Sequence, residues 1–159
     1  MIRYMEHPSP LGQLTLAATE VGICGVYFHD QRNFKGSKGW QHQQHRHLAT
    51  AARQLDAYFA GERDRFDVAL DLEIIGTAFQ RSVWQALLTI QYGTTSSYGN
   101  HAILIDNPRA VRAVGSAIGR NPISIIVPCH RVVGSNGALT GYDGGLERKK
   151  YLLQLEGVL

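Results

Sequence analysis

The stretch from residue 123 to residue 133 constrains the chain most, because it joins an apolar run directly to reactive side chains. Residues 123–127 (Ile-Ser-Ile-Ile-Val) are rich in β-branched residues and predict a short buried strand. Pro128 has no backbone N–H and ends that strand. Cys129, His130 and Arg131 follow at once, so the fold must hold them where a buried element ends.

Cys129 is a candidate nucleophile. A thiol beside two groups that can carry positive charge is a favourable place for a thiolate. The alternative is a cysteine that acts as a small apolar side chain, since free Cys is among the most frequently buried residue types. The adjacent His130 and Arg131 favour the nucleophile.

The composition is that of a globular chain of 159 residues, enough for one domain or two small ones. No apolar run approaches 18 residues, so we expect no membrane span. Residues 1–7 have no signal-peptide pattern, and two distant cysteines make no disulfide framework. A reducing compartment, and hence a cytoplasmic location, is expected.

The net charge of +3 is unevenly placed. Residues 1–72 carry eight Lys and Arg against eight Asp and Glu, whereas residues 73–159 carry eight against five. The whole excess therefore lies in the half that contains Cys129, which favours a polyanionic partner there.

The first half predicts a small α/β domain with an antiparallel sheet, over residues 1–72. Residues 2–28 contain short strands around a turn at 9–12. Residues 48–60 predict a helix, with apolar side chains on one face and Gly61 after its end. Residues 68–75 are a candidate for a further strand.

The second half, residues 73–159, predicts mainly helices, so the fold class is α+β. Thr77 and Gln80 form a capping box that opens a helix to about residue 90, and a second short helix covers 97–105. Asp106-Asn107-Pro108 predicts a new helix start, and that helix runs to about residue 119. A last helix covers about 146–156.

The helix ending near residue 119 has two faces. Val111, Val114 and Ile118 are expected inside, and Arg109, Arg112 and Ser116 outside, among small residues. With the preceding short helix it makes a helix-turn-helix candidate; an ordinary amphipathic helix pair is the alternative.

The Pro-Cys-His-Arg-Val run at 128–132 resembles the signature of the O6-alkylguanine-DNA alkyltransferases. Further motifs of that family occur in the same order, at residues 109–115, 121–122, 141–146 and 156–157. The resemblance implies an RNase H-like N-terminal domain and a winged-helix-like C-terminal domain. It also implies a DNA repair protein that takes an alkyl group onto a cysteine and is consumed by doing so, without a cofactor.

The resemblance gives four residues catalytic roles. Cys129 is similar to the alkyl acceptor, and His130 to the base that acts through an ordered water. Glu156 resembles the carboxylate that orients the histidine. A carboxylate at a helix C-terminus is unfavourable unless it is solvated or has a specific partner, which agrees with that role. Asn121 looks like the residue that fixes the turn around Cys129.

The same resemblance implies double-stranded DNA containing O6-alkylguanine as the partner of a monomer, with O4-alkylthymine as a further substrate. The modified base must leave the duplex. Arg112 resembles the side chain that replaces it, on a helix that enters the minor groove with Arg109 and Ser116. Tyr98 resembles the tyrosine that contacts the flipped guanine and a phosphate.

Five residues are implied in the base pocket. Val132 and Asp143 match positions whose backbone groups bind the base edge, Tyr142 matches a pocket wall, and Lys149 a nearby donor. Animal members have a proline at the position of Ser124. In lacking this proline, the chain resembles the constitutive bacterial members, and the loss of the rigid ring predicts a wider pocket.

Metal binding is not expected. Some family members hold zinc through N-terminal cysteines and a histidine, but only Cys24 is present here, at a strand-like position typical of the core. His42, His45 and His47 have no cysteine or carboxylate to complete a metal set and are typical of a solvated helix start.

Two other function classes compete. A protein that binds alkylated DNA without repairing it would lack the motif cysteine, and Cys129 is present. A cysteine hydrolase with a Cys-His-Glu set would explain the nucleophile but not the basic helix with Arg112.

Overall fold

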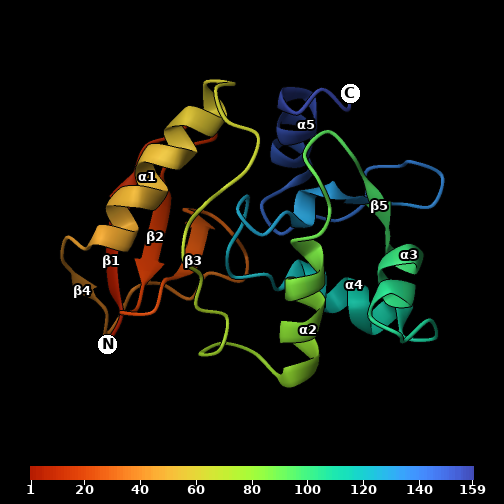
Figure 1. Cartoon of the computed structure of the whole chain (residues 1–159), viewed down its shortest axis with the longest axis horizontal. Coiled ribbons are helices and arrows are strands. Elements are labelled where there is room, and N and C mark those ends of the chain that lie inside the picture. Colours follow the sequence, from red (N-terminus) through yellow and green to blue (C-terminus); the bar gives the residue numbers. More distant parts are fainter.

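A computed structural model describes residues 1–159. The N-terminal half is built on a four-stranded sheet in the order β3-β2-β1-β4, from β1 (Arg3–His7), β2 (Leu14–Ala18), β3 (Ile23–Phe28) and β4 (Gln41–His42). The first three strands pair antiparallel, as expected, and the two-residue β4 joins the edge parallel to β1. Helix α1 (Arg46–Phe59) packs across this sheet (Figure 1).

The segment 68–75 does not form the expected strand. Its only pairing is a bridge between Leu70 and Ile23, held by two backbone hydrogen bonds on either side of Ile23. The Asp71 carboxylate then accepts from the Thr19 hydroxyl at 2.7 Å and from the Glu73 N–H at 3.1 Å. This side chain supplies the backbone with a local partner and ends the pairing after one bridge.

The C-terminal half is mainly helical, with α2 (Ala78–Leu87), α3 (Tyr98–Leu104), α4 (Val111–Gly119) and α5 (Leu146–Leu155). The capping box of α2 is confirmed: Gln80 N–H donates to the Thr77 hydroxyl, and Thr77 N–H donates to the Gln80 side chain. Ser97 caps α3 in the same manner. Two short strands, β5 (Ser96–Ser97) and β6 (Val132–Val133), pair parallel and bring the start of α3 beside the motif.

The predicted start of α4 at residues 106–108 is wrong. Asp106 adopts a left-handed backbone (φ 59°), and Asn107 N–H donates to Ala102 at the end of α3. This segment therefore finishes α3, and α4 begins only at Val111 without a side-chain cap. Val111 is consequently 39% exposed instead of buried, and Ala117 joins Val114 and Ile118 in the core.

The predicted strand at 123–127 is also wrong, although every residue in it is buried. Only Ile123 pairs with the sheet, through a bridge to Val26. Ile125 has a positive φ of 74°, and Val127 N–H donates back to Ile123 O at 3.0 Å. The Asn121 side chain binds backbone groups of Ile123 and Val127, so the run folds into a buried turn.

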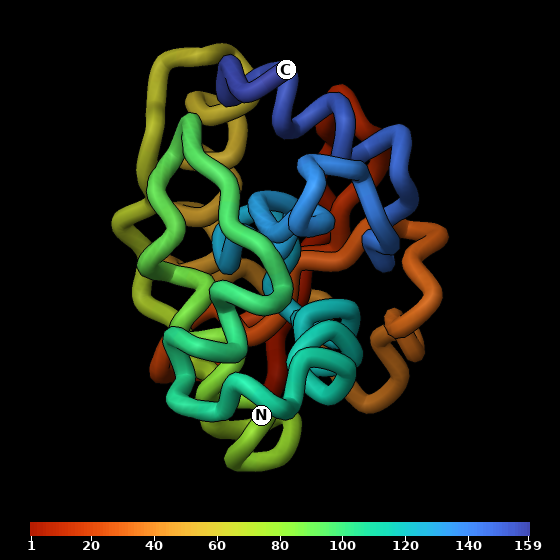
Figure 2. Tube along the Cα trace, turned by 90° about the vertical axis from the view of Figure 1, so that its right-hand side faces the viewer, coloured from red at the N-terminus to blue at the C-terminus, as the bar shows by residue number.

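The two halves share one hydrophobic core of 27 buried residues, drawn from the sheet, α1, α2, α4, the 123–132 segment and α5. Figure 2 shows the 121–133 segment running through the middle of the molecule, between the N-terminal half and α4. No helix in the structure combines the length and the apolar composition that a membrane crossing requires. The turn that carries Cys129 is thus surrounded by both halves.

Candidate active site

Cys129 opens a single 3-10 turn, η1 (Cys129–Arg131), and is only 6% exposed. The Asn121 side chain fixes its position. Asn121 Nδ2 donates to the Val127 carbonyl at 2.8 Å and lies 3.1 Å from Cys129 Sγ. Asn121 Oδ1 accepts from Ile123 N–H at 3.0 Å. One amide therefore holds both ends of the buried turn and touches the sulfur.

His130 and Glu156 form a fully buried pair. His130 Nε2 lies 2.7 Å from Glu156 Oε2, so the neutral ring carries its proton on Nε2 and donates it to the carboxylate. His130 Nδ1 is buried and has no partner in the protein. That nitrogen has a free lone pair and is the atom that can accept a proton.

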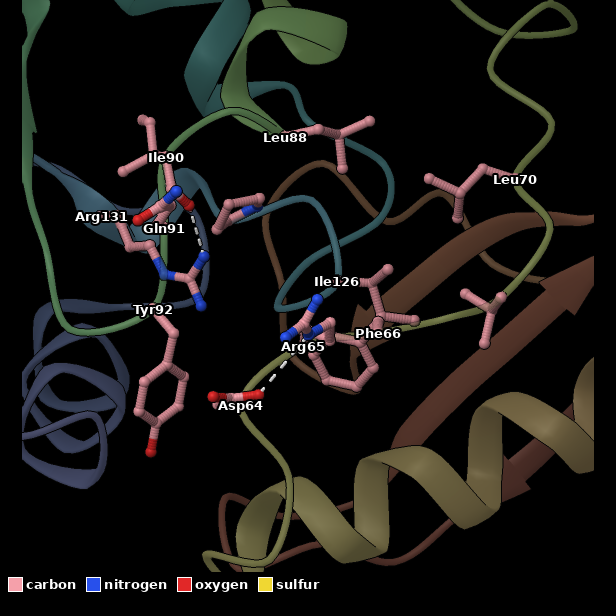
Figure 3. Close-up of a pocket in the computed structure, with 12 residues that line it drawn as sticks. Asp64, Arg65, Phe66, Leu70, Leu88, Ile90, Gln91, Tyr92, Ile126 and Arg131 are labelled. Atoms are coloured by element: carbon pink, nitrogen blue, oxygen red, sulfur yellow. Dashed lines mark hydrogen bonds and ion pairs between the residues drawn. The ribbon is translucent and has the colours of Figure 1, made fainter.

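Arg131 points to Glu156 and not to the sulfur. Its Nε donates to Glu156 Oε1 at 2.8 Å and its Nη2 to Oε2 at 3.0 Å. Nη1 donates to the Ile90 carbonyl at 2.6 Å, as the dashed line in Figure 3 shows. The guanidinium also lies 5.8 Å from the ring centre of Tyr92, at the edge of a cavity of about 490 Å³. A bidentate contact of this kind fixes the carboxylate plane.

Glu156 caps the C-terminal end of α5, where a carboxylate needs a specific partner, and the structure supplies it. Burial alone would raise the pKa of Glu156. Hydrogen bonds from His130, Arg131 and Tyr58 outweigh burial and lower that pKa to about 2. Glu156 is therefore ionised at neutral pH.

The thiol is protonated at rest. Burial raises the pKa of Cys129 to about 11, against the opposing effects of the Asn121 hydrogen bond and the Lys149 charge. Burial also lowers the pKa of His130, against the effect of Glu156. A protonated thiol, a neutral imidazole and an ionised carboxylate are the resting charge states of a nucleophile that requires a general base.

An open cavity of about 800 Å³ lies on the surface between the two halves. Residues from the N-terminal loop 30–33, from α3, from α4 and from the loop 140–145 line it, among them Tyr98, Ser116, Tyr142 and Asp143. Tyr98 contacts α4 at Gly115, where an added Cβ would lie 3.6 Å from its ring. The Tyr98 hydroxyl accepts from Thr140 at 3.0 Å. Arg109 and Arg112 are exposed beyond this cavity and do not line it.

Family comparisons identify the fold and the activity. The model of the 6-O-methylguanine DNA methyltransferase ribonuclease-like domain matches residues 2–72, and that of the DNA binding domain matches residues 78–158. A methylated-DNA–protein-cysteine methyltransferase of Mycolicibacterium paratuberculosis is 52% identical over 98% of this chain and 93% of its own length. The chain belongs to the 6-O-methylguanine DNA methyltransferase family.

Solved structures agree with this assignment. The Mycobacterium tuberculosis O6-methylguanine methyltransferase has a TM-score of 0.88 and 50% identity, over 98% of this chain and 93% of that one. The complex of Mycobacterium tuberculosis OGT with DNA has a TM-score of 0.86 and 50% identity, over 98% and 91%. The expected two-domain α+β architecture is confirmed, and so are DNA as the partner and methyl transfer from DNA to a protein cysteine as the repair activity.

Lys149, expected as a donor near the base pocket, donates to two backbone carbonyls. It is fully buried, and its Nζ donates to the carbonyls of Val132 at 2.6 Å and Thr140 at 2.9 Å. Burial lowers the pKa of Lys149 to about 8. It therefore ties the 140–145 loop to β6, and the Val132 carbonyl is already engaged.

Three other residues expected in the base pocket contact the N-terminal half. The Ser124 hydroxyl is 3.4 Å from Gln31 Oε1, and the Tyr142 ring packs edge-on against Phe28 at 6.3 Å. The Tyr142 hydroxyl is buried without a partner, and burial raises its pKa. The resemblance implied a role only for the backbone of Asp143, but its side chain accepts from the Asn33 N–H at 3.1 Å.

Cys24 and His45, which were considered as metal ligands, lie in the N-terminal half. Cys24 is buried in β3, and burial raises its pKa to about 12. His45 caps α1 by accepting from His47 N–H at 3.2 Å. Sequence reasoning missed the contacts of Tyr58, Arg131 and Asn33. Of these three, only Arg131 could be noticed in the sequence, because it follows Cys129 and His130. Its position there suggested a contact with the Cys129 thiol, whereas the structure pairs it with Glu156.

Proposed function

We propose that Cys129 is the residue that accepts the alkyl group, and that the chain removes it from O6-alkylguanine, and from O4-alkylthymine, flipped out of duplex DNA. The observation that carries this proposal is the arrangement of His130. Its Nε2 is bound to Glu156 and its buried Nδ1 has no partner in the protein, while Asn121 holds the thiol of Cys129, the preceding residue.

In the proposed reaction, His130 Nδ1 takes the thiol proton through one water. The thiolate attacks the alkyl carbon, an S–C bond forms, and the bond from that carbon to O6 breaks with its electron pair going to guanine. The guanine takes up a proton, assisted at N3 by the Tyr98 hydroxyl. The proton lost by the thiol balances the proton gained by the base, so no cofactor is needed.

We infer that the exposed face of α4 enters the minor groove. Arg109, Arg112 and Ser116 are all exposed on this side of the molecule, and Gly115 keeps the surface low. Arg112 has no ion-pair partner in the structure and is free to occupy the space that a flipped base leaves.

Val132, Tyr142, Asp143, Ser124 and Lys149 would form and support the base pocket. We place the boundary between the two domains near residue 72. One acceptor thiol and one DNA-binding face in each chain suit a monomer. Both cysteines are free, and an acceptor thiol needs a reducing compartment, which supports a cytoplasmic location.

The stability of the S–C bond that forms on Cys129 allows a test by the stoichiometry of repair. S-alkyl-cysteine is a thioether on a saturated carbon, which water does not hydrolyse as it does a thioester. With excess O6-methylguanine DNA, repair should stop at about one equivalent per chain, with one methyl mass added to the Cys129 peptide. Cys129→Ser should abolish transfer, and Cys24→Ala, the matched control, should keep it. Sustained turnover would instead indicate the cysteine hydrolase, and methylation of Cys24 would overturn the assignment of Cys129.

A further inference from the structure

Tyr58 reaches the Glu156 carboxylate from the other half of the molecule. It lies near the end of α1, and its hydroxyl donates to Glu156 Oε2 at 2.6 Å, across 98 residues of sequence. Figures 1 and 2 show the C-terminal ends of α1 and α5 at the same end of the molecule. The N-terminal half therefore contributes a side chain directly to the His130–Glu156 pair.

The position of Tyr58 is rigid. The residue is 0% exposed, and its ring packs against Phe59, Phe66 and Tyr92 at centroid distances of 5.4, 5.3 and 6.2 Å. Burial raises the pKa of Tyr58 far above its usual value, so the hydroxyl stays protonated and acts only as a donor towards Glu156. A fixed donor at hydrogen-bond distance constrains the carboxylate in the same way as Arg131 does.

Glu156 Oε2 is a shared acceptor. It receives Tyr58 at 2.6 Å, His130 at 2.7 Å and Arg131 at 3.0 Å. Hydrogen bonds to an ionised carboxylate reduce the electron density that each further donor meets. Tyr58 therefore weakens the attraction of Glu156 for the His130 proton without touching His130 itself.

We propose that Tyr58 is a positioning residue of the alkyl transfer, which holds Glu156 in place and keeps His130 from becoming too basic. This inference rests on the proposed function, in which His130 must be neutral to receive the Cys129 proton. A more basic His130 would be protonated at higher pH and unable to act as base. Tyr58 thus preserves the base at neutral pH.

The other ionisable groups around this pair are few. Glu156 faces Arg131 of η1 and Tyr92 of the loop between α2 and β5, and His130 also lies within the field of Lys149 of α5 and next to Cys129 in sequence. Tyr92 donates to the Leu155 carbonyl at 3.3 Å and not to the carboxylate. Tyr92 is therefore a matched control for Tyr58, because its ring packs against that of Tyr58 but its hydroxyl donates to a backbone carbonyl and not to Glu156.

The test is the pH profile of the single-turnover transfer rate. In Tyr58→Phe, His130 gains basicity, so the acidic limb of the profile should move to higher pH by about one unit, with a rate about tenfold lower below that limb. Free O6-benzylguanine and alkylated duplex should be affected equally, because Tyr58 is fully buried and has no surface with which to contact DNA. Tyr92→Phe should keep the wild-type profile.

A second variant covers the case in which Tyr58→Phe folds poorly. Fluorotyrosine introduced at position 58 alone has a more acidic hydroxyl and is a stronger donor, so the acidic limb should move to lower pH. An unchanged limb in a folded variant, or an equal shift in Tyr92→Phe, would overturn the role of Tyr58. Failure of the wild-type protein to stop at one equivalent on Cys129 would instead overturn the proposed function.

Discussion

At the scale of single residues, Glu156 links stability with chemistry. A buried ionised carboxylate is tolerated only with several donors, and here Tyr58, His130 and Arg131 supply four contacts. The pKa of about 2 lies below the ordinary value of 4.5, so the folded state favours the ionised form. The contacts that hold Glu156 against His130 thus also make folding dependent on pH.

The sign of that dependence follows from linkage. A lowered folded-state pKa gives stability that is fully present above pH 4.5 and is lost as pH falls from 4.5 through about 2. The contribution is about 3 kcal/mol at neutral pH. The difference in unfolding free energy between wild type and Glu156→Gln should therefore shrink over this range in urea titrations. The exposed Glu147→Gln should show no such change, and a constant difference for Glu156 would contradict the assignment.

At the same scale, we propose that Ser124 affects alkyl selectivity. Its N–H donates to Val26 O at 3.1 Å, so a proline would remove this bond as well as fill space. Ser124→Val adds volume and keeps the N–H. We expect its rate on O6-benzylguanine DNA to fall more than its rate on O6-methylguanine DNA, because added bulk meets the larger group first. An unchanged benzyl-to-methyl ratio, as expected for the exposed Ser82→Val, would place Ser124 outside the pocket.

At the scale of elements, α3 and α4 form the face that we propose binds DNA. Asp106 and the turn after it end α3 and delay α4 to Val111, which leaves Arg109 in the turn before the helix and Arg112 in its first turn. The small residues Gly115 and Ser116 lie one turn further, beside Tyr98 and the open cavity. Helix α4 and the turn before it thus place the two arginines at one end and the small residues Gly115 and Ser116 next to the open cavity.

This separation gives a prediction for Arg112. Arg112→Ala should slow repair of alkylated duplex strongly, by about tenfold or more, since extrusion of the base costs a few kcal/mol. Reaction with free O6-benzylguanine should change little, because no base must be extruded. Arg120→Ala removes a charge just after α4 and serves as the control for net charge. Equal losses of Arg112→Ala on both substrates would make Arg112 a residue of the fold.

At the scale of the whole molecule, the two halves are held as one unit. The core cluster includes residues of both halves, and Asp30 and Asn33 of the N-terminal loop bind Arg148 and Asp143 near the pocket. Tyr58 adds a contact to Glu156. Both halves therefore contribute contacts around the candidate site.

Unfolding should then be a single cooperative transition. Trp40 and Trp84 lie in different halves, so Trp40→Phe leaves the buried Trp84 as a reporter of the C-terminal half alone. Its fluorescence and the far-ultraviolet circular dichroism, which follows both halves, should give the same midpoint in urea. Two separate midpoints would show that the halves unfold independently.

Local patterns in the sequence determined much of this molecule. The capping box at Thr77, the buried face of α1 and the strands before residue 28 depend on neighbours along the chain, and all are present. The need of Glu156 for a partner was also readable, because its place at a helix end is a local feature. The motif around Cys129 carried the family, and the family comparisons confirm it.

Tertiary structure decided the rest. The 123–127 run has strand composition, yet the Asn121 side chain binds its backbone and folds it into a turn. Arg131 is two residues from Cys129 in sequence, but its guanidinium donates to the carboxylate of Glu156. Tyr58 is 98 residues from the carboxylate that it binds. The sequence specifies which side chains are available. Tertiary packing determines which donor meets which acceptor, because a buried polar group must be hydrogen-bonded and its partner can come from a distant part of the chain.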